Sequence, residues 1–113
     1  MSEVPLSPRI ARLPVVVALG CEVRLARGLR SRLLGLTGLD RTEAGAGLLI
    51  PRCSSVHTFG MRFALDLHFL DRNGHEVARR LAVAPRRFAF CGGASAVLEL
   101  PAGMGGEIAP RSP

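Results

Sequence analysis

One segment constrains the fold of this chain more than any other: residues 63–83, where an alternating run meets a turn sequence and a second extended run. In a β-strand successive side chains point to opposite faces, so every second residue shares a face. The first face carries Phe63, Leu65, Leu67 and Phe69. Asp71-Arg72-Asn73-Gly74 then has the residues of a type I turn, with a glycine free to adopt a positive φ. The sequence therefore predicts a β-hairpin with strands at about residues 64–70 and 76–83.

The turn also fixes an expected register for this hairpin. Counting outward pairs Asp71 with His75, Phe69 with Val77, Leu65 with Leu81 and Asp66 with Arg80. Asp66 and His68 fall on the strand face opposite to the leucines, and we expect that face to be polar and solvated. With an arginine across the hairpin, the Asp66 carboxylate should stay ionised and brace backbone N–H groups or form a salt bridge. Asp66 is therefore predicted to be structural rather than catalytic.

The remaining pattern is that of a small β-rich domain. Extended segments are expected within residues 15–27 with a bend at Gly20, and at residues 48–51, 54–59, 86–91 and 96–100. One short amphipathic helix is predicted near residues 28–37, from Leu29, Leu33 and Leu36, and residues 40–43 have the spacing of a capping box for a single further turn. The predicted fold class is β-dominated α+β. We expect a single compact domain of about six or seven short, mostly antiparallel strands, barrel- or sandwich-like, with that one helix.

Length and composition limit the class of protein. The chain has 113 residues, of which 48% are hydrophobic and 21% charged, as expected for one soluble globular domain. The longest apolar run, residues 13–19, is far shorter than the roughly 20 residues of a membrane-spanning helix. We expect a flexible tail at residues 1–13, the domain at 14–105 and a second flexible tail at 106–113. The expected location is cytoplasmic; the alternative is an N-terminal export or lipoprotein leader that ends at Cys21.

The cysteines and histidines carry no signature of a metal centre. Cys21, Cys53 and Cys91 are expected as buried free thiols, because none belongs to a C-x-x-C pair or a close Cys/His cluster. No ligand set has workable spacing, so the sequence predicts neither a tightly bound metal nor a cofactor. A Cys-His-Asp triad can be drawn from these residues, but no nucleophile elbow supports it.

The basic residues raise the question of nucleic acid. All 15 of them are arginine, the formal net charge is +6, and the arginines are spread along the chain rather than clustered. The chain has five Phe and no Trp or Tyr; four of the Phe are expected in core faces, which leaves Phe59 alone free to stack on a base. Nucleic acid is therefore an unexpected partner, and weak binding through dispersed arginines is kept as an alternative.

The sequence resembles a known family over roughly residues 15–105. The resemblance rests on the runs Gly47-Leu48-Leu49-Ile50 and Val56-His57-Thr58, on Met61, Asp66, Phe69, Leu70, Asp71 and Gly74, and on Leu98-Glu99-Leu100-Pro101-Ala102-Gly103. These residues are similar in order and spacing to the small prokaryotic proteins catalogued as domain of unknown function 192. The resemblance implies a compact β-rich fold and supplies no reaction. The family usually has proline where this chain has Ala64, and it continues into a further helix or strand beyond Gly103.

Two classes of function remain open. The first is a non-catalytic binding or assembly module for a protein partner or a small anionic ligand. Its binding face would comprise His57, Thr58, Phe59, Met61, Arg62, Asp66 and Arg80. The second is a small hydrolase or metal-dependent enzyme that uses His57, His68 and Asp66. A cleft in which a histidine and Asp66 converge within hydrogen-bond reach would favour the enzyme.

Overall fold

The structure is a computed structural model, and it describes residues 6–103. The helices are α1 (Pro8–Ala11), α2 (Leu29–Leu34) and α3 (Arg41–Ala44). The strands are β1 (Val15–Ala18), β2 (Cys21–Leu25), β3 (Leu48–Pro51), β4 (Ser55–His57), β5 (Leu65–Leu70), β6 (Glu76–Val83), β7 (Phe88–Phe90) and β8 (Ala96–Pro101). The β-dominated α+β class is confirmed, with eight strands and three short helices within the described residues.

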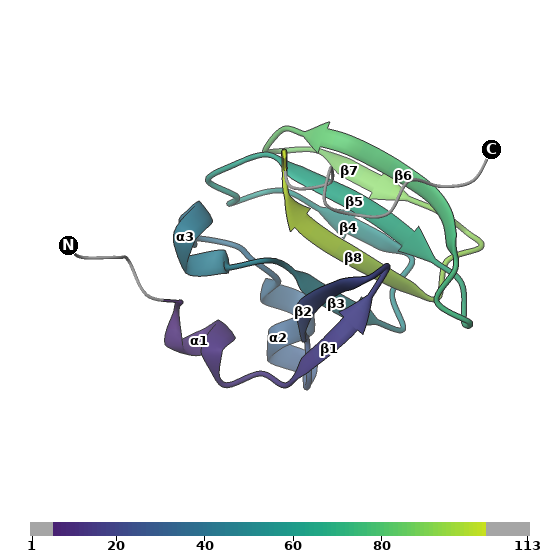
Figure 1. The fold of residues 1–113 in the computed structure, drawn as a ribbon. Coiled ribbons are helices and arrows are strands. Elements are labelled where there is room, and N and C mark those ends of the chain that lie inside the picture. Colours follow the sequence, from purple (N-terminus) through teal and green to yellow (C-terminus); the bar gives the residue numbers. More distant parts are fainter. Residues whose placement is uncertain (1–5, 104–113) are drawn as a thin grey trace.

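The strands form two sheets. One sheet has six strands in the order β1-β2-β3-β8-β5-β6, and a two-stranded ribbon joins β4 to β7. Every pair of neighbours is antiparallel except β2 and β3, which are parallel. A parallel pair needs a crossover connection, and here that connection contains α2 and α3. In Figure 1 the ribbon lies behind β5 and β8, and the three helices gather beside β1, β2 and β3.

The central strand β8 has two buried faces. Its Glu99 lies between Leu48 of β3 and Leu67 of β5, and its Leu98 lies between Leu49 of β3 and His68 of β5. We call these the Glu99 face and the His68 face of the sheet. The larger core cluster fills the Glu99 face, with β4, β7 and residues 36–39 packed over it, and a smaller cluster fills the His68 face. β5 and β8 are accordingly the most completely buried strands of the domain.

The predicted hairpin is confirmed, but its register is wrong. The Asp71 N–H donates to the His75 carbonyl oxygen at 2.8 Å, as the turn required. Further out, Leu67 rather than Asp66 lies opposite Arg80, Leu65 lies opposite Val83, and Phe69 lies opposite Ala78. Two irregularities cause this, one between Phe69 and Leu70 and one between Leu65 and Leu67. Each bulge adds an unpaired residue to one strand, which a count from the turn cannot anticipate.

The segment before β1 packs against the domain. Residues 6–13 belong to the region expected as a tail, and within them Ile10 and Leu13 are buried in the larger core cluster. The Arg9 guanidinium donates from Nη2 to the carbonyl oxygens of Gly35 and Thr37, at 3.0 and 2.7 Å. The helix α1 thereby fixes the loop that follows α2. The tail expected at residues 106–113 lies outside the described residues.

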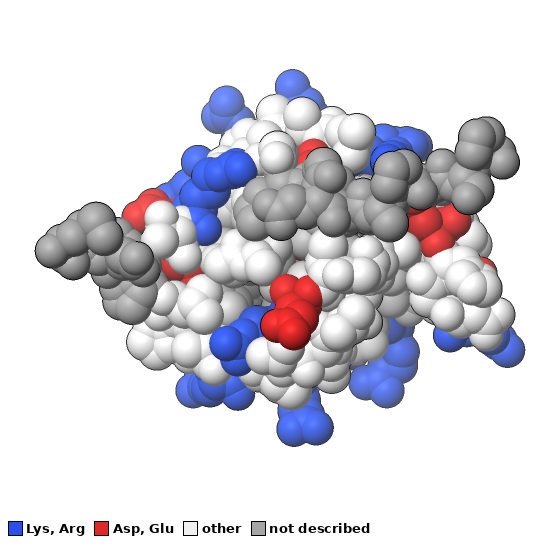
Figure 2. Space-filling view, viewed as in Figure 1, with Lys and Arg blue, Asp and Glu red and all other residues white. Residues whose placement is uncertain are grey.

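Two further expectations concern the surface. No helix within residues 6–103 is long and apolar enough to cross a membrane. On the face drawn in Figure 2, arginines are distributed around the outline rather than gathered in one patch, as their spread in the sequence indicated.

Candidate functional site

A cavity of about 210 Å³ lies on the Glu99 face of the sheet. It is bounded by α2 with its C-terminal loop, by the segment from β3 to β4, and by β8. Its apolar walls include Leu34, Leu36, Ile50, Val56 and Met61. Its polar groups come from Arg32, Thr37, Cys53, Ser55, His57 and Glu99. Concave, mostly apolar lining with a few polar groups is the usual character of a small-ligand site.

Glu99 is the most unusual residue of this cavity. It is only 4% exposed, and its carboxyl Oε1 is buried without a hydrogen-bond partner among the described residues. Its cross-strand neighbours Leu48 and Leu67 are fully buried leucines, so they supply no hydrogen-bond donor. Burial raises the pKa of Glu99 to about 7, because transfer from water to an apolar environment penalises the charged form. Near neutral pH this carboxyl therefore exchanges between ionised and protonated states.

Gly35 brings the end of α2 onto the Glu99 carboxyl. A Cβ atom at Gly35 would lie 3.1 Å from Glu99 Oε1, and the backbone there has φ +52°, which disfavours other residues. A glycine at position 35 therefore allows both the backbone turn that ends α2 and the close approach of that backbone to the Glu99 carboxyl. Because Arg9 holds the carbonyl oxygen of Gly35, this wall of the cavity is fixed from outside.

Arg32 contributes a second unpartnered group to the same cavity. Its Nη2 donates to the carbonyl oxygen of Arg52 at 3.0 Å, whereas its Nε is buried and has no acceptor among the described residues. The cavity thus contains an acceptor without a donor, on Glu99, and a donor without an acceptor, on Arg32. Buried polar groups in proteins are nearly always paired, so two such groups of opposite kind on residues of one cavity suit a molecule that carries both a donor and an acceptor.

His57 and Cys53 lie at the cavity as well. The Phe59 N–H donates to His57 Nδ1 at 3.2 Å, which makes Nδ1 the acceptor and places the proton of a neutral ring on Nε2. The Cys53 thiol is partly buried and donates to the Ser55 carbonyl oxygen at 3.0 Å.

The structure separates the other predicted binding residues. Met61 is buried in the cavity wall, and Phe59 is exposed. Thr58 is buried and structural, because its hydroxyl donates to the Ala84 carbonyl oxygen and accepts from the Arg87 N–H. Arg62 is exposed and forms an ion pair with Asp40 at 3.1 Å. Of the predicted segment 57–62, the residues His57 and Met61 line the cavity.

Neither Asp66 nor Arg80 lines the cavity, and the two residues do not lie opposite each other in the β5–β6 hairpin. Asp66 is buried, and its Oδ1 accepts a hydrogen bond from the Ala82 N–H at 2.7 Å. Ala82 has a positive φ of 53°, so the carboxylate braces an irregular segment of β6. Arg80 is exposed, and its guanidinium donates to the carbonyl oxygen of Arg79. The expected pairing of Asp66 with Arg80 is wrong, whereas the expected contact of Asp66 with a backbone N–H is present.

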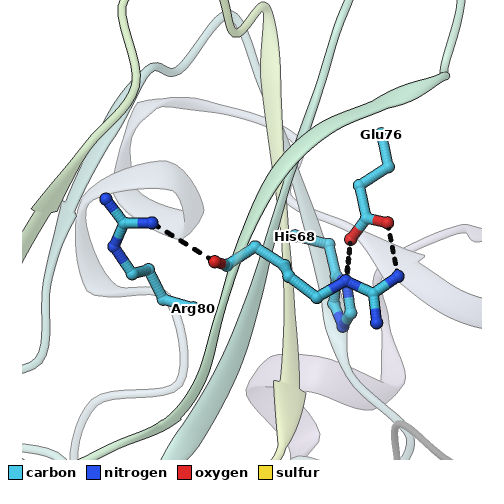
Figure 3. Close-up of polar contacts among 4 residues, drawn as sticks. His68, Glu76 and Arg80 are labelled. Carbon is cyan, nitrogen blue, oxygen red and sulfur yellow. Dashed lines mark hydrogen bonds and ion pairs between the residues drawn. The ribbon is translucent and has the colours of Figure 1, made fainter.

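The strand face that carries Asp66 and His68 is buried, which corrects the expectation of a solvated face. His68 is almost fully buried, and its Nδ1 lies 2.6 Å from Glu76 Oε2; Figure 3 shows the ring and the carboxylate pointing toward each other. Arg79 donates from Nε and Nη2 to the same carboxylate, at 3.0 and 2.6 Å. Burial tends to raise the pKa of Glu76, but the hydrogen bonds from Arg79 and His68 outweigh it and lower the pKa.

The residues of the predicted enzyme do not converge. Asp66 is bonded to β6, His68 to Glu76, and His57 lies at the cavity, which neither of the other two lines. Within residues 6–103 no three His, Cys, Asp or Glu side chains are grouped as a metal site would require. The geometry therefore lends no support to a hydrolytic or metal centre built from these three residues.

Sequence reasoning missed Glu99 and Arg32. Residues 96–100 are predicted as a strand, but the glutamate within them is not among the predicted site residues. A signal was present: an acidic residue flanked by Leu98 and Leu100 in a strand with few other polar residues. A strand of this kind is buried on both faces when it is central, so its one charge must enter the core or a cavity.

The chain matches the DUF192 family, described as "Uncharacterized ACR", over residues 16–109. It belongs to that family. The match covers the sheet from Val16 onward and every residue that lines the cavity, and it confirms the resemblance found in the sequence. No curated protein matches this DUF192 chain.

Two solved structures share the fold of this DUF192 protein. One is a protein of unknown function from Novosphingobium aromaticivorans DSM 12444, with a TM-score of 0.61 and 19% identity over 78% of this chain and 68% of that one. The other is from Sinorhizobium meliloti 1021 and is named provisionally as a transcription regulator; its TM-score is 0.67, with 19% identity over 86% of this chain and 84% of that one. Likeness at this identity shows the fold alone.

Proposed function

We propose that this DUF192 protein is a non-catalytic binding domain whose cavity takes a small zwitterionic molecule with an apolar body. An aliphatic α-amino acid is the simplest molecule of this kind. The Glu99 carboxyl carries the proposal, because it is 4% exposed, lines the cavity and leaves Oε1 unpartnered. A buried carboxyl without a donor destabilises the protein, and a ligand ammonium that donates to it would remove that penalty.

Arg32 supports the second charge of the ligand. Its buried Nε is a cationic donor without an acceptor, which suits a ligand carboxylate. Leu36, Ile50 and Val56 then offer an apolar wall for the body of the molecule. The cavity of about 210 Å³ is smaller than the roughly 300–1,000 Å³ of a typical drug site, which suits a small metabolite.

This proposal refines the anionic ligand expected from the sequence. A molecule with negative charge alone would be repelled by Glu99 whenever that carboxyl is ionised, and would leave Oε1 without a donor. A zwitterion satisfies Arg32 with its anionic end and Glu99 with its cationic end. His57 and Met61 keep a place in the site as lining residues, whereas Arg62, Asp66 and Arg80 do not line the cavity.

The test is a titration followed by two-dimensional ¹⁵N NMR with leucine and two truncated analogues. 3-Methylbutylamine lacks the carboxylate of leucine, and 4-methylpentanoate lacks its ammonium. We expect leucine to shift the amide signals of Gly35, Leu36 and Glu99 saturably. Each analogue should bind about ten-fold more weakly or worse, because a charge-assisted hydrogen bond contributes about 1.5–3 kcal/mol.

Two variants make the test specific. Glu99→Gln should abolish the preference for leucine over 4-methylpentanoate, while Glu22→Gln, at an exposed glutamate of β2, should leave it unchanged. Leucine that produces no saturable shifts at about 10 mM, a concentration that detects even millimolar binding, or shifts that Glu99→Gln leaves intact, would refute the proposal.

Proton exchange gives an independent measurement. A ligand ammonium beside Glu99 favours the ionised carboxyl, so binding near pH 7 should release protons from the fraction that is protonated in the free protein. Calorimetric titrations in buffers of different ionisation enthalpy should show this release. The affinity should weaken as the pH falls below about 7, and Glu99→Gln should remove that dependence.

A further inference from the structure

The outer face of the β4–β7 ribbon exposes aromatic side chains that the cavity does not use. Phe88 is 73% exposed and Phe90 65%, and they share one face because they are two residues apart in β7. This corrects the expectation that four of the five phenylalanines lie in core faces. Nucleic acid was an unexpected partner partly on that basis, so the correction reopens this alternative.

Three of the exposed rings lie close together across the ribbon. The His57 ring lies opposite Phe88 in register, with ring centroids 6.5 Å apart, and it lies 5.8 Å from the Phe59 ring. The hydrogen bond from the Phe59 N–H to His57 Nδ1 orients the histidine. We call His57, Phe59, Phe88 and Phe90 the aromatic platform. His57, Phe88 and Phe90 lie on the paired strands β4 and β7, in which the backbone rises about 6.6 Å between alternate residues, and Phe59 follows two residues after His57.

Positive charge borders the aromatic platform without compensating acids nearby in sequence. Arg86 and Arg87 directly precede Phe88, Arg52 precedes β4, and all three are exposed. Residues 44–65 and 77–98, which include β4 and β7 and the chain on either side of each, contain no aspartate or glutamate except Asp66 and Glu76 just outside these bounds. The chemistry of the surface therefore favours a partner that is both anionic and rich in flat rings.

Two other occupants fit this surface less well. A second copy of the chain in a two-fold dimer would bring the arginines of each ribbon edge toward those of the other, because the same patch meets itself. A membrane surface would favour an uninterrupted apolar patch, whereas Phe88 and Phe90 alternate across the ribbon with the polar residues His57 and Ser55. Those polar side chains suit hydrogen bonds to base edges.

We propose that the aromatic platform binds single-stranded nucleic acid, with bases stacked on Phe88, Phe90 and the His57–Phe59 pair and phosphates paired with Arg86 and Arg87. Stacking platforms bordered by cationic side chains bind single strands with little sequence preference, because every base has a flat face. The proposal does not rest on the ligand of the cavity: within the aromatic platform only His57 also lines the cavity, whereas Phe59, Phe88 and Phe90 do not.

Fluorescence anisotropy with labelled oligo(dT) and oligo(U) of about 12 nucleotides, within the usual site size of a single-strand binding domain, tests the proposal at low salt. We expect saturable binding, with a blunt-ended duplex of the same length bound more weakly. Phe88→Ala with Phe90→Ala should weaken binding about 20-fold or more, from roughly five-fold or more for each lost stacking partner. Val77→Ala with Leu81→Ala, at exposed apolar positions of β6, is the matched control and should change nothing.

The salt dependence tests the arginines separately. Arg86→Ser with Arg87→Ser should reduce the slope of log K against log salt by about 0.7 for each phosphate that is no longer paired with an arginine. Arg12→Ser with Arg72→Ser removes the same charge at exposed sites elsewhere and should keep the slope. Circular dichroism of each variant checks that the fold is intact.

Several results would overturn the proposal. The first is that neither oligonucleotide binds saturably. The second is that the phenylalanine variant binds as well as the parent, and the third is that both arginine variants lose the same affinity for the oligonucleotides. Vesicles with phosphatidylglycerol bound through Phe88 and Phe90 while oligonucleotides are not would identify a membrane surface instead. A dimer in analytical ultracentrifugation that the phenylalanine variant dissociates, without oligonucleotide binding, would identify a self-association face.

Discussion

Glu76 and Glu99 are two glutamates with buried side chains on the same six-stranded sheet, and they differ in what surrounds them. The Glu76 carboxylate is held by Arg79 and His68, and its pKa is lowered despite burial. The Glu99 carboxyl has Leu48 and Leu67 as cross-strand neighbours, leaves Oε1 unpartnered, and has a pKa raised to about 7. Burial alone therefore does not identify a site residue. The partners of the buried charge do, and of these two carboxyls it is Glu99 that faces a cavity with an unfilled hydrogen-bonding position.

The first prediction removes the partnered carboxylate. Glu76→Ala should lower the free energy of unfolding by about 3 kcal/mol, because His68 and the inner part of Arg79 lose their acceptor in a buried setting. Urea denaturation at pH 7 measures the change. Glu22→Ala, at an exposed glutamate, serves as the control. A decrease below about 1 kcal/mol, the scale of an ordinary hydrogen bond, would mean that the partners of Glu76 do not make its buried carboxylate important for stability, which would contradict the contrast with Glu99.

The second prediction removes the unpartnered charge. The folded protein keeps a proton on Glu99 that the unfolded chain loses above its pKa of 4.5, so the stability from Glu99 is fully present below pH 4.5. It is lost as the pH rises from 4.5 to about 7, by about 3 kcal/mol in total. Glu99→Gln should remove this decline, so that the variant gains relative to the parent as the pH rises from 4.5 to about 7 and beyond.

Denaturation curves across that pH range, for the parent and for Glu99→Gln, measure the difference directly. Taking the difference cancels the titration of the other groups, including Glu76, which destabilises the fold at low pH once its carboxylate is protonated. A difference that stays constant from pH 4.5 to above pH 7 would show that Glu99 has a partner at all pH values.

The third prediction concerns Asp66, a buried carboxylate that accepts from a backbone N–H. Asp66→Ala should cost about 1–2 kcal/mol, because the Ala82 N–H loses its acceptor beside the bulge of β6. Asp66→Asn keeps an oxygen acceptor and should cost about half as much. Thermal unfolding of the two variants, side by side, gives the comparison. Equal effects would indicate that the charge matters more than the hydrogen bond.

The fourth prediction has the smallest effect and tests the role of burial. Arg62 and Asp40 form an ion pair in which both side chains are largely exposed. Arg62→Ala should therefore change the free energy of unfolding by less than about 0.5 kcal/mol, since water screens the pair. The same urea measurement at pH 7 applies. A decrease in the free energy of unfolding as large as that of Glu76→Ala would show that burial does not explain the difference between the Glu76 ion pairs and the exposed Arg62–Asp40 pair.

The sequence predicted local structure better than it predicted which residues lie opposite each other in neighbouring strands. The Asp71–Gly74 turn and the alternation before it located the hairpin, because both depend on neighbours in the chain. The register failed at two bulges between β5 and β6, which the turn sequence does not encode. The exposure of Phe88 and Phe90 failed for a related reason: alternation shows which residues share a face, but not which face a neighbouring sheet covers.

Only part of the candidate site could be predicted from the sequence. His57 and Met61 belong to the predicted binding face and both line the cavity, although Met61 is buried rather than part of an exposed face. Glu99 and Arg32 come from β8 and α2, which stand far apart in the chain and meet at the cavity. A single sequence gives no means of placing those two elements side by side.

The position of β8 has a consequence for how the protein is made. This strand is the last described one in the chain, yet it lies between β3 and β5 and joins the two halves of the large sheet. During synthesis the halves β1-β2-β3 and β5-β6 therefore emerge with unpaired edges, which invite pairing with other chains until residues 96–101 arrive. Glu99 arrives in the same strand, so the cavity is completed at the moment when the nascent sheet closes.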